Sequence, residues 1–426
     1  MNPRITLRGA RVLDPASGID RIDDLHLAQG RVLALGAAPD GFEAELNIDL
    51  SGRWLMPGLI DLAARMREPG FEYRASLESE LRAAMAGGIT SVCCPPDTDP
   101  PLDEPGLVEM LKHRARMLAG PALYPLGALT VGLQGEVITE MGQLTEAGCV
   151  GFAQPGCLPV DTQSLARALE YASTFGFTVW LQPQDPHLGR GGVAHSGRVA
   201  SRLGLPSVPV TTETVALHTV FELVRAIGAR VHLCRISSAA GVELLRRAKH
   251  EGLPVSADVA IHHLHLTDVD IGHFDSRYRV DPPFRDGRDR DALGAALADG
   301  TIDAVCSDHT PVDDDSKQVP FAEAEPGLSA LELLLPLLVK WSTEHGIDLL
   351  RALGGATDRA ARVLGIEAGS LAPGQVADLC VFDPQIRWQP GPATLRSQCR
   401  FTPFSDYEIM GRTSAVVLGG RYIPID

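Results

Sequence analysis

The residues of this chain that could do chemistry are mainly arginines and aspartates that follow short apolar segments. Ala63 and Arg65 come directly after the apolar run 56–62, and because they are two residues apart on one strand they share a face. Neither can bind a divalent cation, since alanine offers no lone pair and arginine carries a permanent positive charge. The pair therefore raises the question of whether this strand end forms a catalytic site.

A second group with ligand-type side chains consists of His262, His263 and His265. Imidazole is a common metal ligand, but adjacent residues of a strand point to opposite faces, so we favour structural packing over metal binding. We also expect His232 to be a core histidine with its hydrogen bonds satisfied. His309 is expected to hydrogen-bond locally.

The elements that must position these residues differ between the middle and the ends of the chain. The middle alternates apolar strands with amphipathic helices, which predicts an α/β fold, a (β/α)8 barrel of the TIM type, over residues 57–365. The ends, 1–56 and 366–426, consist of short strands and turns and are predicted to form one small composite β-sandwich domain. The expected barrel strands are 56–63, 89–93, 122–126, 150–152, 178–181, 230–233, 255–259 and 304–307, and the clearest helices are 76–86, 162–174, 213–227, 239–250 and 329–343.

Composition limits the possible partners and compartments. The 426 residues carry a formal net charge of -16, which argues against a nucleic-acid partner. No apolar run is long enough for a membrane span, and the first residues lack a signal-peptide pattern, so we expect a cytoplasmic protein. The eight cysteines are scattered and are expected to be small buried hydrophobes rather than disulfides or a zinc cluster.

The order of short motifs resembles the dihydroorotase branch of the amidohydrolase superfamily over nearly the whole chain. The motifs are Met-Pro-Gly-Leu-Ile-Asp at 56–61, Arg-Glu-Pro-Gly at 67–70, Gly-Gly-Ile-Thr at 87–90, Pro-Asp-Thr-Asp-Pro at 96–100, Asp-Pro-Pro-Phe-Arg at 281–285 and Ser-Asp-His-Thr-Pro at 307–311. The resemblance implies a site at the C-terminal mouth of the barrel. In that family, imidazoles and carboxylates hold zinc ions there, and an aspartate at the end of the last strand shuttles a proton.

The positions that correspond to the family's metal ligands hold residues that are not zinc ligands. They are Ala63, Arg65, Gln154, Gln182 and Arg235. Asp308 stands at the position of the proton-shuttling aspartate. One carboxylate cannot hold a zinc pair, so the resemblance predicts no metal cofactor and only a vestigial role for Asp308.

The substrate-binding positions are also altered. Arg67 corresponds to the arginine that clamps the substrate carboxylate in the family, whereas Asp97 and Asp281 stand where the family has asparagines. An added carboxylate repels an anionic substrate, so these three residues are predicted to be vestigial substrate-binding residues. We also expect Arg65, Arg67 and Arg235 to face Asp97, Asp281 and Asp308, replacing the metal charge by charge-assisted hydrogen bonds.

These expectations lead to a functional hypothesis with two alternatives. Chains that resemble dihydroorotase without its histidines are noncatalytic companions of aspartate carbamoyltransferase, so the resemblance implies a chain that is not an enzyme and assembles with that transferase in a hetero-oligomer in pyrimidine biosynthesis. A homodimer is also conceivable. The first alternative is an active metal-dependent hydrolase of cyclic amides with an atypical site, which would use zinc, and the second is an anion-binding sensor.

Overall fold

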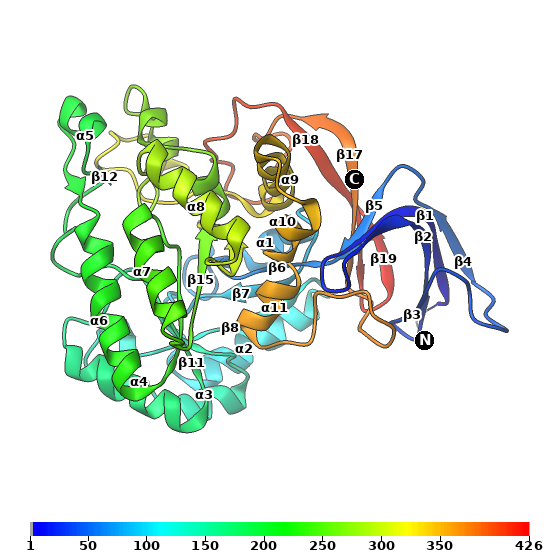
Figure 1. The fold of residues 1–426 in the computed structure, drawn as a ribbon, viewed down its shortest axis with the longest axis horizontal. Helices are drawn as coiled ribbons and strands as arrows, with labels where there is room; N and C mark the ends of the chain where they lie inside the picture. The colour runs from blue at the N-terminus through cyan, green and yellow to red at the C-terminus, as the bar shows by residue number, and fades with distance from the viewer. Residues whose placement is uncertain (1–2, 426) are drawn as a thin grey trace.

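The first and last strands of the chain belong to one eight-stranded sheet at one end of the molecule, where β18 also contacts the helices α1 and α9 (Figure 1). The computed structural model describes residues 3–425. The strand order is β19-β18-β17-β5-β1-β2-β3, and β4 pairs with β1 outside this path. The strands are β1 Ile5–Asp14, β2 Ile19–Ala28, β3 Arg31–Leu35, β4 Leu46–Asp49, β5 Trp54–Pro57, β17 Leu379–Trp388, β18 Ile409–Leu418 and β19 Arg421–Pro424.

This terminal sheet curls around a core of its own. Leu7 of β1, Val32 of β3 and Val417 of β18 belong to one buried cluster. The hairpin turns at the two ends of the sheet meet, because a Cβ at Gly420 would lie 2.5 Å from the Cα of Gly30. The predicted small β-sandwich domain built from both termini is confirmed.

The middle of the chain forms a barrel of parallel strands surrounded by helices (Figure 1). One run of six strands has the order β16-β15-β14-β11-β10-β9 and a second has the order β6-β7-β8, with β8 and β9 separated only by Leu126. The strands are β6 Leu59–Asp61, β7 Ile89–Cys94, β8 Ala122–Pro125, β9 Gly127–Ala128, β10 Phe152–Gln154, β11 Thr178–Leu181, β14 Arg230–Leu233, β15 Val255–Ala260 and β16 Ala304–Cys306.

The barrel closes between β16 and β6 through the residues that follow each strand. The backbone N–H of His309 donates to the carbonyl of Ala63 over 3.1 Å, and the N–H of Ser307 donates to Oδ1 of Asp61 over 2.9 Å. The predicted TIM-type barrel is therefore confirmed, and its last strand lies beside its first at the end where the candidate residues gather.

The helices begin where the sequence supplies side-chain caps. Ser76, Asp161 and Ser238 each accept a hydrogen bond from a backbone N–H in the first turn of α1, α4 and α7. The α-helices are α1 Leu77–Ala86, α2 Pro105–Met117, α3 Met141–Ala147, α4 Thr162–Phe175, α5 Arg198–Leu203, α6 Thr211–Ile227, α7 Ala239–His250, α8 Gly287–Asp299, α9 Leu334–His345, α10 Leu349–Gly354 and α11 Asp358–Leu364. The remaining short elements are the strands β12 Ala194–His195 and β13 Ser207–Val208 and the 3₁₀ helices η1 Val131–Leu133, η2 Ile261–Leu264, η3 Asp268–Ile271, η4 Ser276–Tyr278, η5 Asp315–Lys317 and η6 Leu331–Leu333.

Two expected elements differ from the structure. The strand expected at 56–63 is divided at Gly58, because β5 pairs with β17 of the terminal sheet whereas β6 pairs with β7 of the barrel. The helix expected at 329–343 begins only at Leu334, after the 3₁₀ turn η6. Among residues 3–425, no helix combines the length and the apolar character needed to cross a membrane.

Candidate active site

A cavity of about 460 Å³ opens at the C-terminal mouth of the barrel, and we call it the mouth pocket. Most of its walls are loops that follow barrel strands, and the ends of β6, β7 and β16 position the charged residues Arg65, Arg67, Asp97 and Asp308. It is lined by Arg65, Arg67, Arg74, Asp97, Leu133, Pro155, Gly156, Gln182, Val280, Asp281, Asp308, Thr310, Glu325, Pro326, Gly327 and Leu328. Of the residues singled out from the sequence, six therefore line one cavity: Arg65, Arg67, Asp97, Gln182, Asp281 and Asp308.

Arg65 joins two of the aspartates. Its Nε lies 2.6 Å from Oδ2 of Asp97, and its Nη1 lies 3.6 Å from Oδ1 of Asp308. Nη1 also donates to the hydroxyl of Thr310 over 2.9 Å. Burial would raise the pKa of Asp97, but the guanidinium of Arg65 holds it below its ordinary value.

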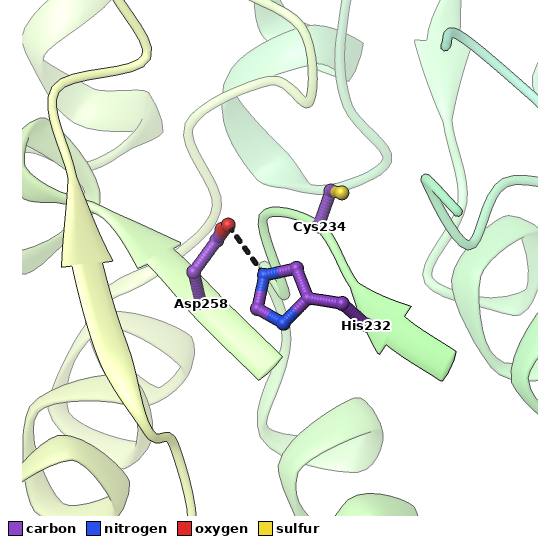
Figure 2. Close-up of side chains that lie close together, drawn as sticks. All are labelled: His232, Cys234 and Asp258. Carbon is purple, nitrogen blue, oxygen red and sulfur yellow. Dashed lines mark hydrogen bonds and ion pairs between the residues drawn. The ribbon is translucent and has the colours of Figure 1, made fainter. Parts of the chain in front are cut away.

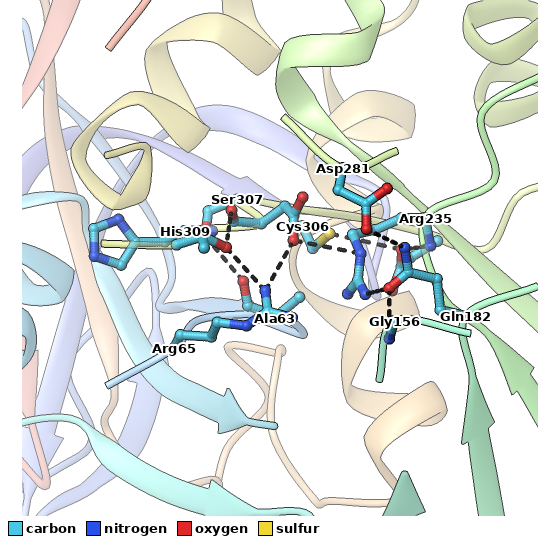
Figure 3. A network of polar contacts seen from close by, with 12 residues as sticks. Ala63, Arg65, Gly156, Gln182, Arg235, Asp281, Cys306, Ser307 and His309 are labelled. Carbon is cyan, nitrogen blue, oxygen red and sulfur yellow. Dashed lines mark hydrogen bonds and ion pairs between the residues drawn. The ribbon is translucent and has the colours of Figure 1, made fainter. Parts of the chain in front are cut away.

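Arg235 approaches Asp308 from the other side. Its Nε lies 3.4 Å from Oδ1 of Asp308, and its Nη2 donates to Oε1 of Gln182 over 2.5 Å (Figure 3). The expectation that Arg65 and Arg235 face aspartates is thus confirmed for Asp97 and Asp308, but a hydrogen bond joins only Arg65 to Asp97, whereas the contacts with Asp308 are ion pairs without a hydrogen bond. Burial nevertheless raises the pKa of Asp308 to about 7, against the opposing effect of the two arginines.

The other two expected contacts are absent. Asp281 accepts hydrogen bonds from the amides of Gln182, at 3.4 Å, and Gln184, at 3.0 Å, rather than from an arginine. Arg67 donates from Nε to the carbonyl of Pro311 over 2.8 Å. Burial and the nearby Arg65 lower the pKa of Arg67 to about 10. The expectation was wrong here because loop geometry, which strand patterns do not encode, sets these partners.

The backbone is strained at the same place. Arg67, Arg235 and Asp308 have φ angles of 62°, 56° and 49°, which lie in a backbone region that residues other than glycine rarely adopt. Such residues persist where the surrounding structure holds them, and they gather at functional sites. Two of these strained residues, Arg67 and Asp308, line the mouth pocket, and the third, Arg235, lies against Asp308.

Gln154 and Ala63, two further positions of interest, make no contribution to this charge cluster. Gln154 accepts from the hydroxyl of Thr130 over 2.9 Å and donates to the carbonyl of Leu133 over 2.8 Å. Ala63 is buried in an apolar cluster with Trp180. Both side chains therefore serve local packing and loop structure.

The histidines are engaged in several different ways. His262 and His263 are buried in η2, with ring centroids 4.7 Å apart and Phe284 against both. They lie in a 3₁₀ turn rather than on a strand, and packing is the role that the structure displays. His309 hydrogen-bonds locally, as expected, only through its backbone N–H, which donates to Oγ of Ser307 over 3.0 Å, whereas Nε2 of its ring lies 2.5 Å from Oε2 of Glu80 on α1.

His232 belongs to a buried chain of hydrogen bonds inside the barrel. Its Nδ1 lies 2.8 Å from Oγ of Ser256, and its Nε2 lies 3.0 Å from Oδ2 of Asp258 (Figure 2). Oδ1 of Asp258 in turn accepts from the backbone N–H of Arg235 over 2.6 Å. His232 is thus a satisfied core histidine, as expected, and it stands directly below the charged mouth.

Two groups of side chains among the described residues could hold a metal ion, and the sequence analysis missed both. One is His232, Cys234 and Asp258, and the other is His195, Asp286 and Asp289; within each group the donor atoms lie within 4.8 Å of one another. For the first group a signal existed, since His232 in β14 and Cys234 directly after it are two residues apart and so can face the same side.

The chemistry of the donors separates these groups from the mouth. A cation beside Asp308 would meet the guanidinium groups of Arg65 and Arg235, so that position does not fit a metal. His232, Cys234 and Asp258 instead offer the nitrogen, sulfur and oxygen donors that Zn²⁺ prefers, and a bound ion would replace the hydrogen bond between Nε2 of His232 and Asp258. Burial raises the pKa of the Cys234 thiol, so metal binding there has to displace its proton.

Known proteins resemble the chain in sequence and in fold. Residues 52–240 match the family model described as dihydro-orotase-like. A dihydroorotase-like protein of Pseudomonas putida is 46% identical over 381 residues, which are 89% of this chain and 90% of the relative. A dihydroorotase of Geobacter sp. is 37% identical over 422 residues, 98% of this chain and 99% of the relative. The solved L-hydantoinase (dihydropyrimidinase) of Arthrobacter aurescens superposes with a TM-score of 0.88 at 23% identity, covering 99% of this chain and 96% of that one.

These comparisons correct two expectations. The prediction that the chain is not an enzyme is contradicted by relatives that match it along nearly their whole length and bear the name of an enzyme, dihydroorotase. The prediction of no cofactor is contradicted by the same relatives, whose family is metal-dependent, together with the donor group around His232. Both errors came from reading only the family's usual ligand positions.

Proposed function

Because the chain belongs to the dihydroorotase-like family of amidohydrolases, we propose that it hydrolyses a cyclic amide that carries a negatively charged group, in the mouth pocket. The observation that carries the proposal is the position of Asp308, a carboxyl with a pKa raised to about 7, between two arginines in a cavity of about 460 Å³. A group with a pKa near neutrality can both accept and return a proton at physiological pH.

The arginines supply the binding and the electrostatics of this proposal. Arg67 and Arg74 line the cavity and would attract a carboxylate or an imide anion. Arg65 and Arg235 lie beside Asp308, where they would stabilise negative charge that develops on the amide oxygen. Their side chains are already held by Asp97 and Gln182, so little reorganisation is needed.

Asp308 would take a proton from the attacking water and deliver it to the nitrogen that leaves the ring. His232, Cys234 and Asp258 are the residues that would hold a divalent metal, which as a Lewis acid lowers the pKa of bound water and polarises carbonyl groups. Of the groups given a role here, Asp308, Arg65, Arg67 and Arg74 line the pocket, and Arg235 lies against Asp308.

The direct test is ring opening of dihydroorotate and of hydantoin by the purified chain, after chelation and again after loading with Zn²⁺. We expect turnover by the loaded protein, with a rate that rises as pH passes through about 7. Asp308→Asn should lower the rate by about 10²–10⁴-fold, whereas Asp314→Asn, an exposed carboxylate, should not change it. Binding of either compound without turnover would contradict the proposal and favour an anion-binding role.

The metal assignment has a separate test. Zinc content after dialysis should be close to one per chain, and Cys234→Ala should abolish it, since the remaining histidine and carboxylate lose a strong ligand. Cys157→Ala is the matched control, because this half-buried cysteine lies outside both donor groups. Equal zinc content in both variants would show that the metal binds elsewhere.

A further inference from the structure

A second charged cavity lies at the opposite end of the barrel from the mouth. We call this cavity of about 380 Å³ the floor pocket. Its walls are the N-terminal ends of β11, β14 and β15 together with α11. It is lined by Thr178, Arg230, Val231, Leu253, Pro254, Val255, Ser256, Asp303, Arg359, Arg362 and Val363.

The charges of the floor pocket are not balanced. Three arginines, at 230, 359 and 362, face one carboxylate, Asp303. That carboxylate is already engaged, since its Oδ2 lies 2.6 Å from Nζ of Lys249 and accepts from the N–H of Ala257 over 2.8 Å. The cavity therefore carries an excess of positive charge.

Arg359 lacks partners for part of its guanidinium. Its Nη2 donates to the carbonyl of Arg351 over 2.9 Å, but its Nε and Nη1 are buried and meet no hydrogen-bond acceptor among residues 3–425. A buried charged donor without an acceptor costs free energy, so such groups normally have an ion, a ligand or water as partner. Arg362 differs, because its Nη2 lies 3.0 Å from Oδ2 of Asp358.

We propose that the floor pocket binds the phosphate group of a small phosphate monoester or free phosphate. The planar guanidinium fork matches the oxygens of phosphate, and Arg359 and Arg230 supply it from α11 and β14. Ser256 lines the same cavity, and its hydroxyl lies 2.8 Å from Nδ1 of His232. The volume of the cavity leaves room for a small organic group beside the phosphate.

The test is calorimetric titration of the full chain with inorganic phosphate and with glycerol 3-phosphate at constant ionic strength. We expect saturable binding of one ligand per chain. Tighter binding of glycerol 3-phosphate would identify the ligand as a monoester, and equal or tighter binding of phosphate would identify the free ion. Arg359→Gln should weaken binding by about tenfold or more, because it removes the fork.

Three further variants make the outcome decisive. Arg359→Lys keeps the charge without the fork and should give intermediate affinity, which covers the case in which the glutamine variant fails to fold. Arg67→Gln in the mouth pocket and Arg246→Gln on the exposed face of α7 should leave the affinity unchanged. The proposal is overturned if neither ligand binds, or if Arg67→Gln abolishes binding while Arg359→Gln does not.

Discussion

Arginines line both ends of the barrel, but the partners of their side chains differ between the two ends. At the mouth, Arg65 and Arg235 are buried against carboxylates and an amide, and Asp308 lies between them. At the floor, Arg359 is partly exposed, but its buried Nε and Nη1 have no hydrogen-bond acceptor among the residues described. The mouth is thus balanced by its own side chains, whereas the floor needs an anion from outside.

This difference shows that the partner, rather than the residue type, decides what a buried arginine contributes. A buried arginine whose carboxylate stays in place is costly to remove, because the carboxylate is left uncompensated. An arginine whose buried nitrogen atoms have no hydrogen-bond acceptor already bears much of that cost in the folded state. The two ends of the barrel should therefore respond in opposite ways to the same substitution.

The largest effect is expected at the mouth. Arg235→Met should lower the free energy of unfolding by about 3–5 kcal/mol, since Asp308 and Gln182 lose a buried partner. Urea denaturation measures this loss, and the exposed Arg246→Met should lose no more than about 1 kcal/mol. The double variant Arg235→Met, Asp308→Leu should recover part of the lost stability, because it removes the uncompensated carboxylate as well. If the double variant is less stable than Arg235→Met alone, Arg235 and Asp308 do not act as a pair.

An intermediate effect concerns the pH dependence of stability. The pKa of Asp308 is raised to about 7, so between about pH 4 and 7 the folded chain keeps a proton that the unfolded chain has lost. The unfolding free energy should therefore fall as pH rises through this window, by up to about 1.4 kcal/mol per pH unit from this one group.

Glu332, with a pKa raised to about 7, and Lys317, with a pKa lowered to about 7, titrate in a similar range. The comparison that isolates Asp308 is thus between the unmodified chain and Asp308→Asn, measured by denaturation at pH 5 and at pH 8. The variant should show the smaller fall. Identical slopes would mean that Asp308 is ionised throughout.

The smallest effect is expected at the floor. Without phosphate, Arg359→Met should change the unfolding free energy by less than about 1 kcal/mol, because the lost hydrogen bond to Arg351 is offset by removal of a buried charge without an acceptor. With phosphate, only the unmodified chain should gain stability, which thermal unfolding detects. If Arg359→Met lowered the unfolding free energy as much as Arg235→Met does, the two ends of the barrel would not differ in how their arginines are balanced.

The sequence predicted the regular elements well where the pattern is local. The strands at 178–181 and 230–233 and the helix at 239–250 have the expected bounds, because periodicity and caps are local properties. The break at Gly58 could not be read in this way, since it depends on pairing between Met56 and Cys380. Contacts over that separation leave no periodic signal.

The candidate site was predictable to the extent that motif order places residues at strand ends. This gave the contacts of Arg65 with Asp97 and of Arg235 with Asp308. It did not give Gln184 as the partner of Asp281, nor Glu80 as the partner of His309, because these contacts depend on loop paths and on a distant helix. Assembly with aspartate carbamoyltransferase, a homodimer and a cytoplasmic location remain predictions.

The curled terminal sheet has a consequence for how the chain is made. β5 lies between β1 and β17 in that sheet. The edge of β5 that pairs with β17 therefore has no partner until the segment 379–388 has left the ribosome. An open edge strand is a template for pairing with another chain. A nascent or prematurely terminated product should therefore aggregate through its first 57 residues, however well its barrel has formed.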